Sequence, residues 1–261
     1  MTEIYDNIRE IYKFSLPCGE LANYIDFFSE SSLDKTNQLI STEHFSVKMF
    51  QSWTPTFWFN FGTPYYIEYN NKRHLVKKSH DILLLRNDTV TRYASCNDHI
   101  FTVKFFPGGL EAILGINQAK LIDKIIPLSA IIPSSLTDKI KNKNSFEERI
   151  KLLQDHFLKN LKRGKGKDYY LHFVKEVIEN YQAENFILNT SQMAEKMFVS
   201  SKTINRYFNA VLGISPKKYF SIVRARTALT EFMVDKKTFV PEQFGYYDMS
   251  HFYKEISNFT Q

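Results

Sequence analysis

The sequence contains little cysteine, glycine and proline, and these shortages exclude several classes of protein. The two cysteines, Cys18 and Cys96, lie far apart and show no Cys-x-x-Cys spacing, so neither a disulfide framework nor a zinc module is indicated. Nine glycines and eight prolines in 261 residues exclude collagen-like and linker-dominated chains. We expect both thiols to be reduced, as in a reducing compartment.

Long apolar stretches are missing as well. No run of 18 apolar residues is present, so no segment is expected to span a membrane. The first six residues, Met1 to Asp6, have neither the basic start nor the apolar centre of a signal peptide. We therefore expect a soluble cytoplasmic protein without a membrane partner.

Sequence motifs of common enzymes are also missing. There is no Gly-x-Ser-x-Gly, no Walker A loop and no Gly-x-Gly-x-x-Gly. The seven histidines form neither a His-x-His pair nor a His-Glu-x-x-His motif, although the sequence leaves open that His74, His80 and His99 meet in space. The prediction is a protein that is not an enzyme and has no cofactor or metal.

What is present is the composition of a folded, aromatic-rich and mildly basic chain. A length of 261 residues exceeds the usual size of one domain, so two domains are expected. Hydrophobic residues make up 43% and charged residues 24%, which excludes low-complexity disorder for most of the chain. The net charge of +6 favours polyanionic partners only if it is concentrated in one region.

Between Glu43 and about Lys104, apolar and polar residues alternate with period two. The strand-like runs are 45–49, 57–61, 65–69, 73–76, 81–85 and 100–105. Asn70 and Asn71 between two of these runs have turn chemistry. Short strands at roughly ten-residue spacing predict a β-sandwich or a cupin-like barrel. The run 21–28 fits either a helix or a strand.

Beyond this region the period becomes helical, so the chain is expected to be α+β. Pro107-Gly108-Gly109 is expected to be a strand-to-helix turn, with anion binding as the alternative. A stripe at helical spacing predicts one long amphipathic helix and consists of Phe146, Ile150, Leu153, Phe157 and Leu161. Basic residues interrupted by two glycines predict a linker at 162–168. The expected domains are a β-rich domain with C-terminal helices at 1–161 and an all-helical domain at 169–261.

The segment 189–213 has the pattern of two short helices joined by a tight turn. Asn189 is a good N-cap, and Gln192 can complete a capping box. Ser200 is a candidate N-cap of the second helix, and Gly213 is expected to terminate it. The second helix is expected to have two faces. The buried face consists of Ile204, Phe208 and Val211, and the exposed face consists of Ser201, Lys202, Asn205 and Arg206.

The exposed face carries the chemistry that a DNA major groove requires. Arginine pairs with guanine, asparagine with adenine, and lysine with guanine or phosphate. A helix-turn-helix presents such residues at the N-terminal end of its second helix. Residues 196–230 contain seven basic and no acidic side chains. Lys217 and Lys218 follow Pro216 at an expected helix start, where phosphate contact is natural. A solvated basic helix that contacts no DNA is the alternative.

The segment 189–261 resembles the DNA-binding domain of AraC/XylS-type transcription regulators. The matching residues are 193–208, Gly213-Ile-Ser-Pro-Lys-Lys-Tyr219, then Arg224, Arg226, Ala228 and Leu229, and finally 244–252. The last of these, Phe-Gly-Tyr-Tyr-Asp-Met-Ser-His-Phe, is the most specific. Residues 101–109, followed by Leu114 and Gly115, are similar to the β-domain fused to such DNA-binding domains.

The resemblance implies two helix-turn-helix units joined by a long helix, with both recognition helices in successive major grooves. Base contacts are then expected from Lys202, Asn205 and Arg206 in the first unit, and from Met249, Ser250, His251, Tyr253 and Lys254 in the second. Pro241 replaces a small residue of the family, so the helix there is expected to be short, to begin near Pro241 or to be missing. The sequence ends before the family's closing helix, so the second unit is expected to be the weaker one.

The N-terminal domain is expected to sense a signal or to mediate dimerisation. Its aromatic residues suggest a pocket for a small-molecule effector, with Trp53, Trp58 and Tyr65 as candidates. A homodimer is an open alternative to a monomer. The predicted function is that of a sequence-specific transcription regulator that binds double-stranded DNA. The alternative is a β-domain binding module, or a cupin-like enzyme, whose helical tail does not read DNA.

Overall fold

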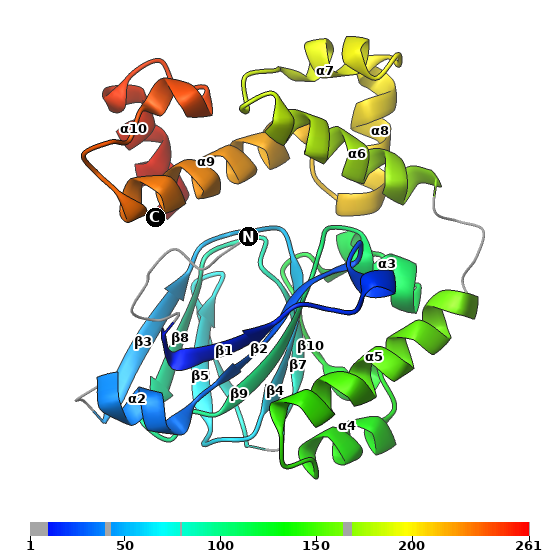
Figure 1. The fold of residues 1–261 in the computed structure, drawn as a ribbon, viewed down its shortest axis with the longest axis vertical. Coiled ribbons are helices and arrows are strands. Elements are labelled where there is room, and N and C mark those ends of the chain that lie inside the picture. The colour runs from blue at the N-terminus through cyan, green and yellow to red at the C-terminus, as the bar shows by residue number, and fades with distance from the viewer. Residues whose placement is uncertain (1–9, 40–42, 79, 164–168, 261) are drawn as a thin grey trace.

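The computed structural model describes residues 10–39, 43–78, 80–163 and 169–260, which form a β-rich part followed by a helical part (Figure 1). Every described strand precedes residue 128, and the described residues from 169 onward contain helices and no strand. The predicted α+β class is therefore confirmed. The predicted linker at 162–168 falls largely on residues 164–168, which lie outside the described residues, while the preceding helix continues to Arg163.

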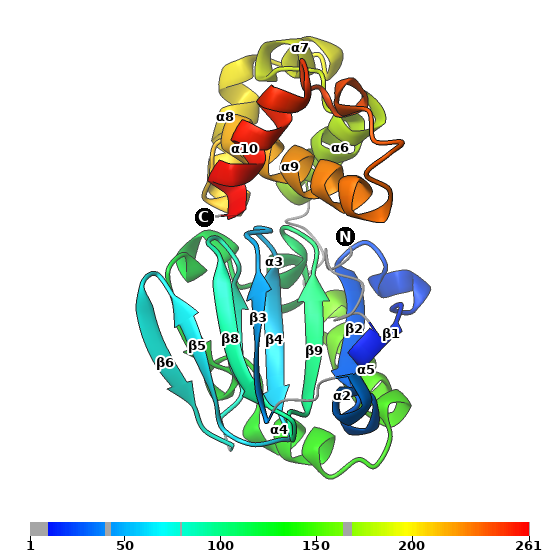
Figure 2. The ribbon, with the colours of Figure 1, turned by 90° about the vertical axis from the view of Figure 1, so that its left-hand side faces the viewer.

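The strands form two antiparallel sheets, which Figure 2 shows from one side. The six-stranded sheet has the order β1 (Tyr12–Ser15), β2 (Ile25–Ser31), β9 (Ile100–Phe105), β4 (Pro55–Asn60), β7 (Ile82–Leu85) and β10 (Ile125–Pro127). The four-stranded sheet has the order β3 (His44–Met49), β8 (Val90–Ser95), β5 (Tyr65–Tyr69) and β6 (Lys72–Val76). One apolar cluster joins the sheets, with Tyr65 and Ile67 from one and Trp58 and Leu84 from the other, so they form a sandwich.

Strand β4 lies in the middle of the six-stranded sheet, and all six of its residues are buried. Phe57 and Phe59 point into a cluster with the helices, while Trp58 points into the cluster between the sheets. Alternation alone suggests that one face of this strand is core and the other is not. Both faces are core, because a helical layer covers one side of the sheet and the second sheet covers the other.

The hairpin between β5 and β6 follows the prediction from its turn residues. Tyr69 is paired with Lys72, which leaves Asn70 and Asn71 as a two-residue loop. Both asparagines have positive φ, 51° and 56°. Two-residue hairpin loops require this backbone region, and asparagine tolerates it better than most residues.

Helices cover the six-stranded sheet (Figure 1). In the β-rich part the helices and 3-10 turns are η1 (Gly19–Leu21), α2 (Leu33–Leu39), α3 (Gly109–Leu114), η2 (Gln118–Leu121), η3 (Leu128–Ala130), α4 (Ser134–Lys141) and α5 (Phe146–Arg163). The predicted stripe of α5 is confirmed, since Leu153 and Phe157 are fully buried against the sheet. The expected turn before α3 is also present; a Cβ on Gly109 would lie 2.0 Å from the carbonyl oxygen of Tyr24, so only glycine fits there.

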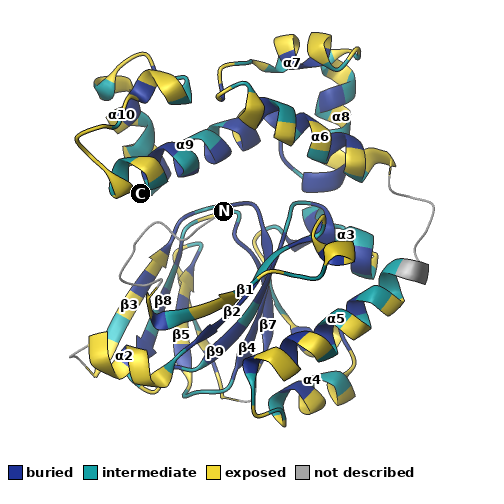
Figure 3. Ribbon diagram, in the orientation of Figure 1, coloured by how far each residue is buried: buried dark blue, intermediate teal, exposed yellow. Residues whose placement is uncertain are grey.

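The helical part contains α6 (Tyr169–Ala183), α7 (Thr190–Lys196), α8 (Ser201–Leu212), α9 (Pro216–Val234), the 3-10 turn η4 (Pro241–Phe244) and α10 (Met249–Thr260). Its larger core is an apolar cluster that includes Phe173, Val177 and Phe208, and it also takes in Phe50 and Trp53 from the β-rich part. Figure 3 shows the buried residues along α9. The two parts of the chain therefore share a core rather than being joined by a linker alone.

Candidate nucleic-acid interface

The first helix-turn-helix unit, α7 and α8, begins with the predicted caps. The Asn189 side chain accepts hydrogen bonds from the backbone N–H groups of Ser191 (2.9 Å) and Gln192 (3.0 Å), and the Gln192 side chain accepts one from the N–H of Asn189 at 2.9 Å. Ser200 Oγ accepts a hydrogen bond from Thr203 N–H at 3.1 Å. These bonds satisfy N–H groups that a helix leaves unpaired at its start, so they define where both helices begin.

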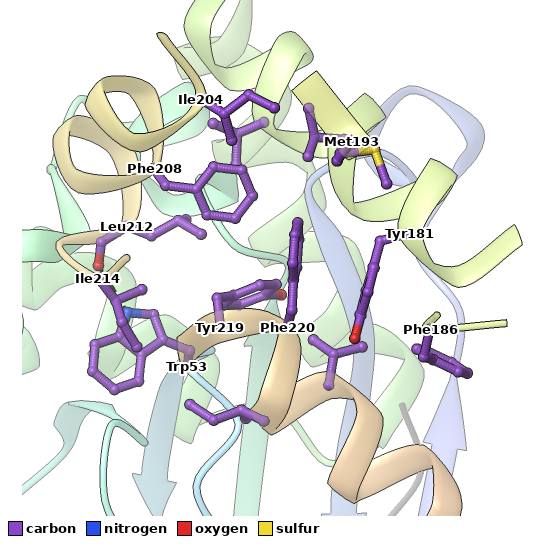
Figure 4. Close-up of a cluster of buried hydrophobic side chains, with 14 of the residues drawn as sticks. Trp53, Tyr181, Phe186, Met193, Ile204, Phe208, Leu212, Ile214, Tyr219 and Phe220 are labelled. Atoms are coloured by element: carbon purple, nitrogen blue, oxygen red, sulfur yellow. Dashed lines mark hydrogen bonds between the residues drawn. The ribbon is translucent and has the colours of Figure 1, made fainter. Parts of the chain in front are cut away.

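Helix α8 has the two predicted faces. Ile204 and Phe208 are fully buried, and the ring of Phe208 packs against those of Tyr219 (5.9 Å) and Phe220 (5.6 Å) from α9 (Figure 4). The helix ends at Gly213, which has φ of 73°. This packing leaves the opposite face of α8 directed away from the core.

On that opposite face, Lys202 and Arg206 are exposed and lie one helical turn apart. Arg206 donates a hydrogen bond to the hydroxyl of Tyr207 at 3.3 Å, and its guanidinium lies 5.0 Å from the Tyr207 ring. Asn205 is only half-exposed and donates its amide N–H to the backbone oxygen of Ser201 at 2.9 Å. The two cations are therefore the more accessible of the predicted base-reading groups.

The start of α9 carries the two lysines predicted to contact phosphate. Ser215 is the N-cap and accepts a hydrogen bond from Lys218 N–H, and Pro216 occupies the first helical position. Lys217 and Lys218 are exposed. Their ammonium charges add to the partial positive charge of the helix N-terminus, which favours an anion at this position.

A groove of about 460 Å³ lies between the start of α7 and one face of α9. Its polar lining includes Asn189, Ser191, Lys217, Ser221 and Arg224. Among its lining residues Arg224 is paired with Glu255, so the exposed Lys217 is the main source of positive charge along the groove.

The second unit is smaller and is built on Pro241. The expectation of a short helix beginning there is confirmed, since η4 is a four-residue 3-10 turn with Pro241 at its start. Its fully buried core consists of Ala228 and Phe252 with Tyr246. Proline lacks an N–H and is tolerated in a first turn, so this position forces no break elsewhere.

Helix α10 begins with a cap from Asp248, whose carboxylate accepts the N–H of His251 at 2.7 Å. His251 Nδ1 accepts the backbone N–H of Tyr247 at 3.2 Å, so the neutral ring carries its proton on Nε2. The residues predicted to read bases here are exposed, apart from the half-buried Met249: Ser250, His251, Tyr253 and Lys254.

An ion pair joins α10 to α9. Arg224 donates to both carboxylate oxygens of Glu255, at 3.3 Å and 2.5 Å, and its guanidinium lies 4.9 Å from the ring of Tyr246. Burial acts to lower the pKa of Arg224, but Glu255 raises it above its ordinary value, so the pair stays charged. Sequence analysis missed this role, because Glu255 lies 31 residues away and no helical spacing relates the two.

The three effector candidates do not share a site. Trp58 lines a cavity of about 60 Å³ between the sheets, together with Met49, Arg86 and Lys104. Tyr65 is buried beside Trp58, with ring centroids 6.3 Å apart, but does not line the cavity. Trp53 lies instead at the boundary of the helical part, where its indole N–H donates to the backbone oxygen of Leu212 at 2.8 Å.

Metal-binding clusters and membrane-spanning helices are both missing from the part of the chain that the structure describes. No group of three or more His, Cys, Asp or Glu residues could share a metal ion there, and His99 instead contacts Glu30 at 2.7 Å. Among the described helices, none has the length and apolarity needed to cross a membrane.

Comparison with known proteins gives similarity only at the level of solved structures. No family model and no curated protein matches the chain. ToxT from Vibrio cholerae is 11% identical, with a TM-score of 0.46, over 83% of this chain and 94% of that one. A ToxT structure with a bound unsaturated fatty acid is 10% identical, with a TM-score of 0.45, over 83% of this chain and 91% of that one. CuxR, an AraC-like transcriptional activator, is 10% identical, with a TM-score of 0.34, over 92% of each chain. The structures similar to this chain thus include an AraC-like regulator, the class that its sequence motifs resemble.

Proposed function

We propose that the protein is a sequence-specific DNA-binding regulator of transcription, with α8 and α10 as its recognition helices. The observation that carries the proposal is the exposed pair Lys202 and Arg206 on α8, directly opposite the buried Ile204 and Phe208. The caps define the start of the helix, so both cations project from its first two turns. This is the part of a helix-turn-helix that reaches base edges.

The arrangement of helix ends supports the same function. The C-terminal ends of α8 and α10 contact the β-rich part, where Trp53 bonds to Leu212 and Lys48 to Thr260. Each helix has 12 residues and so extends about 18 Å from that contact. The N-terminal ends of both helices therefore lie away from the sheets (Figures 1 and 2), where a duplex can approach them.

The basic residues divide into two roles under this proposal. Arg206 and Lys202 read bases, because they lie on the recognition helix itself. Lys217 and Lys218, beside the groove between α7 and α9, contact phosphates and supply affinity that does not depend on sequence. Arg224 serves through Glu255, since the ion pair orients α10 against α9.

We further propose that the β-rich part binds a small-molecule effector in the cavity lined by Trp58. The cavity lies between the sheets, and its wall is largely apolar, with Arg86, Arg92 and Lys104 as its cationic residues. A mostly apolar wall with a few polar groups is typical of small-ligand sites, which usually measure about 300–1,000 Å³. At about 60 Å³ this cavity fits only a ligand of a few heavy atoms. Trp53 and Tyr65 do not belong to this site, because neither lines the cavity.

An electrophoretic mobility shift with DNA from upstream of the protein's own gene, at two salt concentrations, tests the proposal. The wild-type protein is expected to shift this DNA in the presence of excess unrelated duplex. Arg206→Ala is expected to lose about 1–3 kcal/mol of binding free energy and most of the discrimination. Arg73→Ala is the matched control, since Arg73 is also exposed and lies 4.5 Å from a tyrosine ring, but on β6. Equal shifts of specific and unrelated DNA would favour the alternative, a binding module whose helical part does not read sequence.

A further inference from the structure

The end of β3 and the loop that leads to β4 contact the first recognition helix. Trp53 is buried and donates its indole N–H to the backbone oxygen of Leu212, the last residue of α8 (Figure 4). Trp53 has φ of 56°, a backbone region that residues with side chains rarely adopt. A strained residue persists where its surroundings determine its position, and here the determined position is the contact with α8.

The same segment contacts the helix that joins the two units. Arg226 of α9 is 1% exposed, and its guanidinium donates to the backbone oxygens of Phe50 (3.1 Å) and Gln51 (3.2 Å). An arginine in this position stays charged, and leaving its N–H groups without acceptors would be costly. The two carbonyls of the β-rich part are therefore part of the support of α9.

The segment also contacts the second recognition helix. The rings of Phe50 and Phe259 lie 5.6 Å apart, and Lys48 Nζ donates to the backbone oxygen of Thr260 at 2.7 Å. Phe259 and Thr260 are the last two residues of α10. Residues 48–53, the interdomain segment, thus contact the C-terminal ends of both recognition helices and the middle of the helix between them.

The interdomain segment is itself attached firmly to the sandwich. The backbone N–H groups of Ser52 and Trp53 both donate to the carbonyl oxygen of Arg86, at 2.9 Å and 3.0 Å, and Arg86 Nε donates to Ser52 Oγ at 3.0 Å. Arg86 directly follows strand β7. The segment can therefore act as a fixed support and not as a loose connection.

We propose that the interdomain segment positions the two recognition helices relative to each other, so that the β-rich part sets the spacing of the DNA sites that the protein accepts. The inference rests on the proposed DNA-binding function. Two recognition helices fit successive major grooves only when their separation matches a helical turn of DNA, about 34 Å. Trp53, Lys48 and Arg226 are then positioning residues, which act on DNA through α8, α9 and α10.

A spacing assay tests the inference with the full-length chain. A duplex is first selected from a random library by the wild-type protein, and one base pair is then inserted between its two half-sites. The wild type is expected to bind the altered duplex at least about tenfold more weakly, as for a poorly matched site. The spacing ratio is the affinity for the original duplex divided by the affinity for the altered one. The double variant Trp53→Phe, Lys48→Met is expected to reduce this ratio at least about threefold, because its helices adapt to the new spacing. Lys72→Met, on exposed β6, is the control and is expected to leave the ratio unchanged.

A distance measurement without DNA separates this inference from the proposed function. Spin labels are placed at Asn209→Cys on α8 and Ser257→Cys on α10, both exposed, after Cys18 and Cys96 have been replaced by serine. The label distance is expected to be narrowly distributed in the parent and broader in the Trp53→Phe, Lys48→Met variant. Asn117 also donates to the oxygen of Ala210, so the broadening is expected to come mainly from α10.

The spacing ratio can be measured only if the protein binds DNA, whereas the label distance tests the positioning role without DNA. If the wild type selects no duplex while the label distance broadens, the DNA-binding function fails and the positioning role stands. If the wild type binds its selected duplex and both the spacing ratio and the label distance stay unchanged in the variant, the inference is overturned. Lys48→Met alone covers the case in which Trp53→Phe does not fold, because Lys48 is exposed.

Discussion

Arg206 and the lysines at the start of α9 differ in what they can recognise. Arg206 projects from α8, the first proposed recognition helix, whereas Lys217 and Lys218 lie at a helix start, where a phosphate oxygen is the natural acceptor. We expect Lys217→Ala and Lys218→Ala to weaken binding to all duplexes alike. Each lost phosphate contact should reduce the slope of log K against log salt by about one unit. A salt titration with a specific and an unrelated duplex measures this, and a loss confined to the specific duplex would mean that the lysines read bases.

The buried face of α8 predicts a second residue-scale result. Ile204 is fully buried, so Ile204→Ala should lower the free energy of unfolding by about 2–5 kcal/mol. Asn209→Ala, on the exposed face of the same helix, should change it by no more than about 0.5 kcal/mol. Chemical denaturation of the two variants decides the point. Similar small losses for both would mean that the core does not depend on this face.

Single residues were predicted best where the determinants are local. Asn189, Gln192, Ser200 and Gly213 were predicted as caps and terminators, and the structure confirms each of them, because a cap depends on neighbours within three or four residues. The roles of Arg224 and Arg226 were not predicted. Their partners lie 31 and 176 residues away in the sequence, and no periodicity relates residues so far apart.

At the scale of elements, the two proposed recognition helices, α8 and α10, differ in their support. Helix α8 rests on a large core with Phe208, Tyr219 and Phe220, whereas α10 joins that core near its C-terminal end, through Ile256 and Phe259. The N-terminal part of α10 rests on the small core behind a four-residue 3-10 turn. Fewer buried contacts imply that α10 opens more readily. We therefore expect His251→Ala and Lys254→Ala to reduce affinity for a cognate duplex less than Arg206→Ala does. Binding isotherms of the three variants measure this, and a larger loss at 251 or 254 would contradict it.

Strands and helices were predictable to different degrees from their periodicity. The runs at 45–49, 65–69 and 100–105 are strands, and the stripe from Phe146 to Phe157 is one face of α5. The ambiguous run at 21–28 is divided: Leu21 ends the 3-10 turn η1 and residues 25–28 begin β2, whose hydrogen-bonding partner β9 lies far along the chain. Alternation in the run 57–61 does not show that both faces of β4 are buried, because the helices that cover Phe57 and Phe59 lie far along the chain.

At the scale of the whole molecule, the β-rich and helical parts share buried residues. Phe50 and Trp53 belong to the same apolar cluster as the core of the first helix-turn-helix unit. This contact was not predictable, because tryptophan in a β-rich segment fits a ligand pocket as well as an interface. The position of Trp53 changes its interpretation from an effector contact to a support of the helical part.

The shared core predicts cooperative unfolding. In the wild type, thermal transitions followed by far-ultraviolet circular dichroism and by tryptophan fluorescence should coincide, since the helical part and the sandwich unfold together. The Trp53→Ala variant removes the ring at the interface and leaves Trp58 as the fluorescent reporter of the sandwich. In this variant the circular dichroism and fluorescence transitions should occur at different temperatures. Coincident transitions in this variant would contradict an energetic coupling through Trp53.

The central claim is that α8 and α10 together read one duplex. Selection of duplexes from a random library by the full-length protein, followed by sequencing, tests it most directly. Two conserved blocks with centres about 10 base pairs apart are predicted, because recognition helices in successive major grooves lie one helical turn apart. Arg206→Ala should erase one block and leave the other. A failure to enrich any sequence, or the enrichment of a single block that Arg206→Ala leaves intact, would contradict the account.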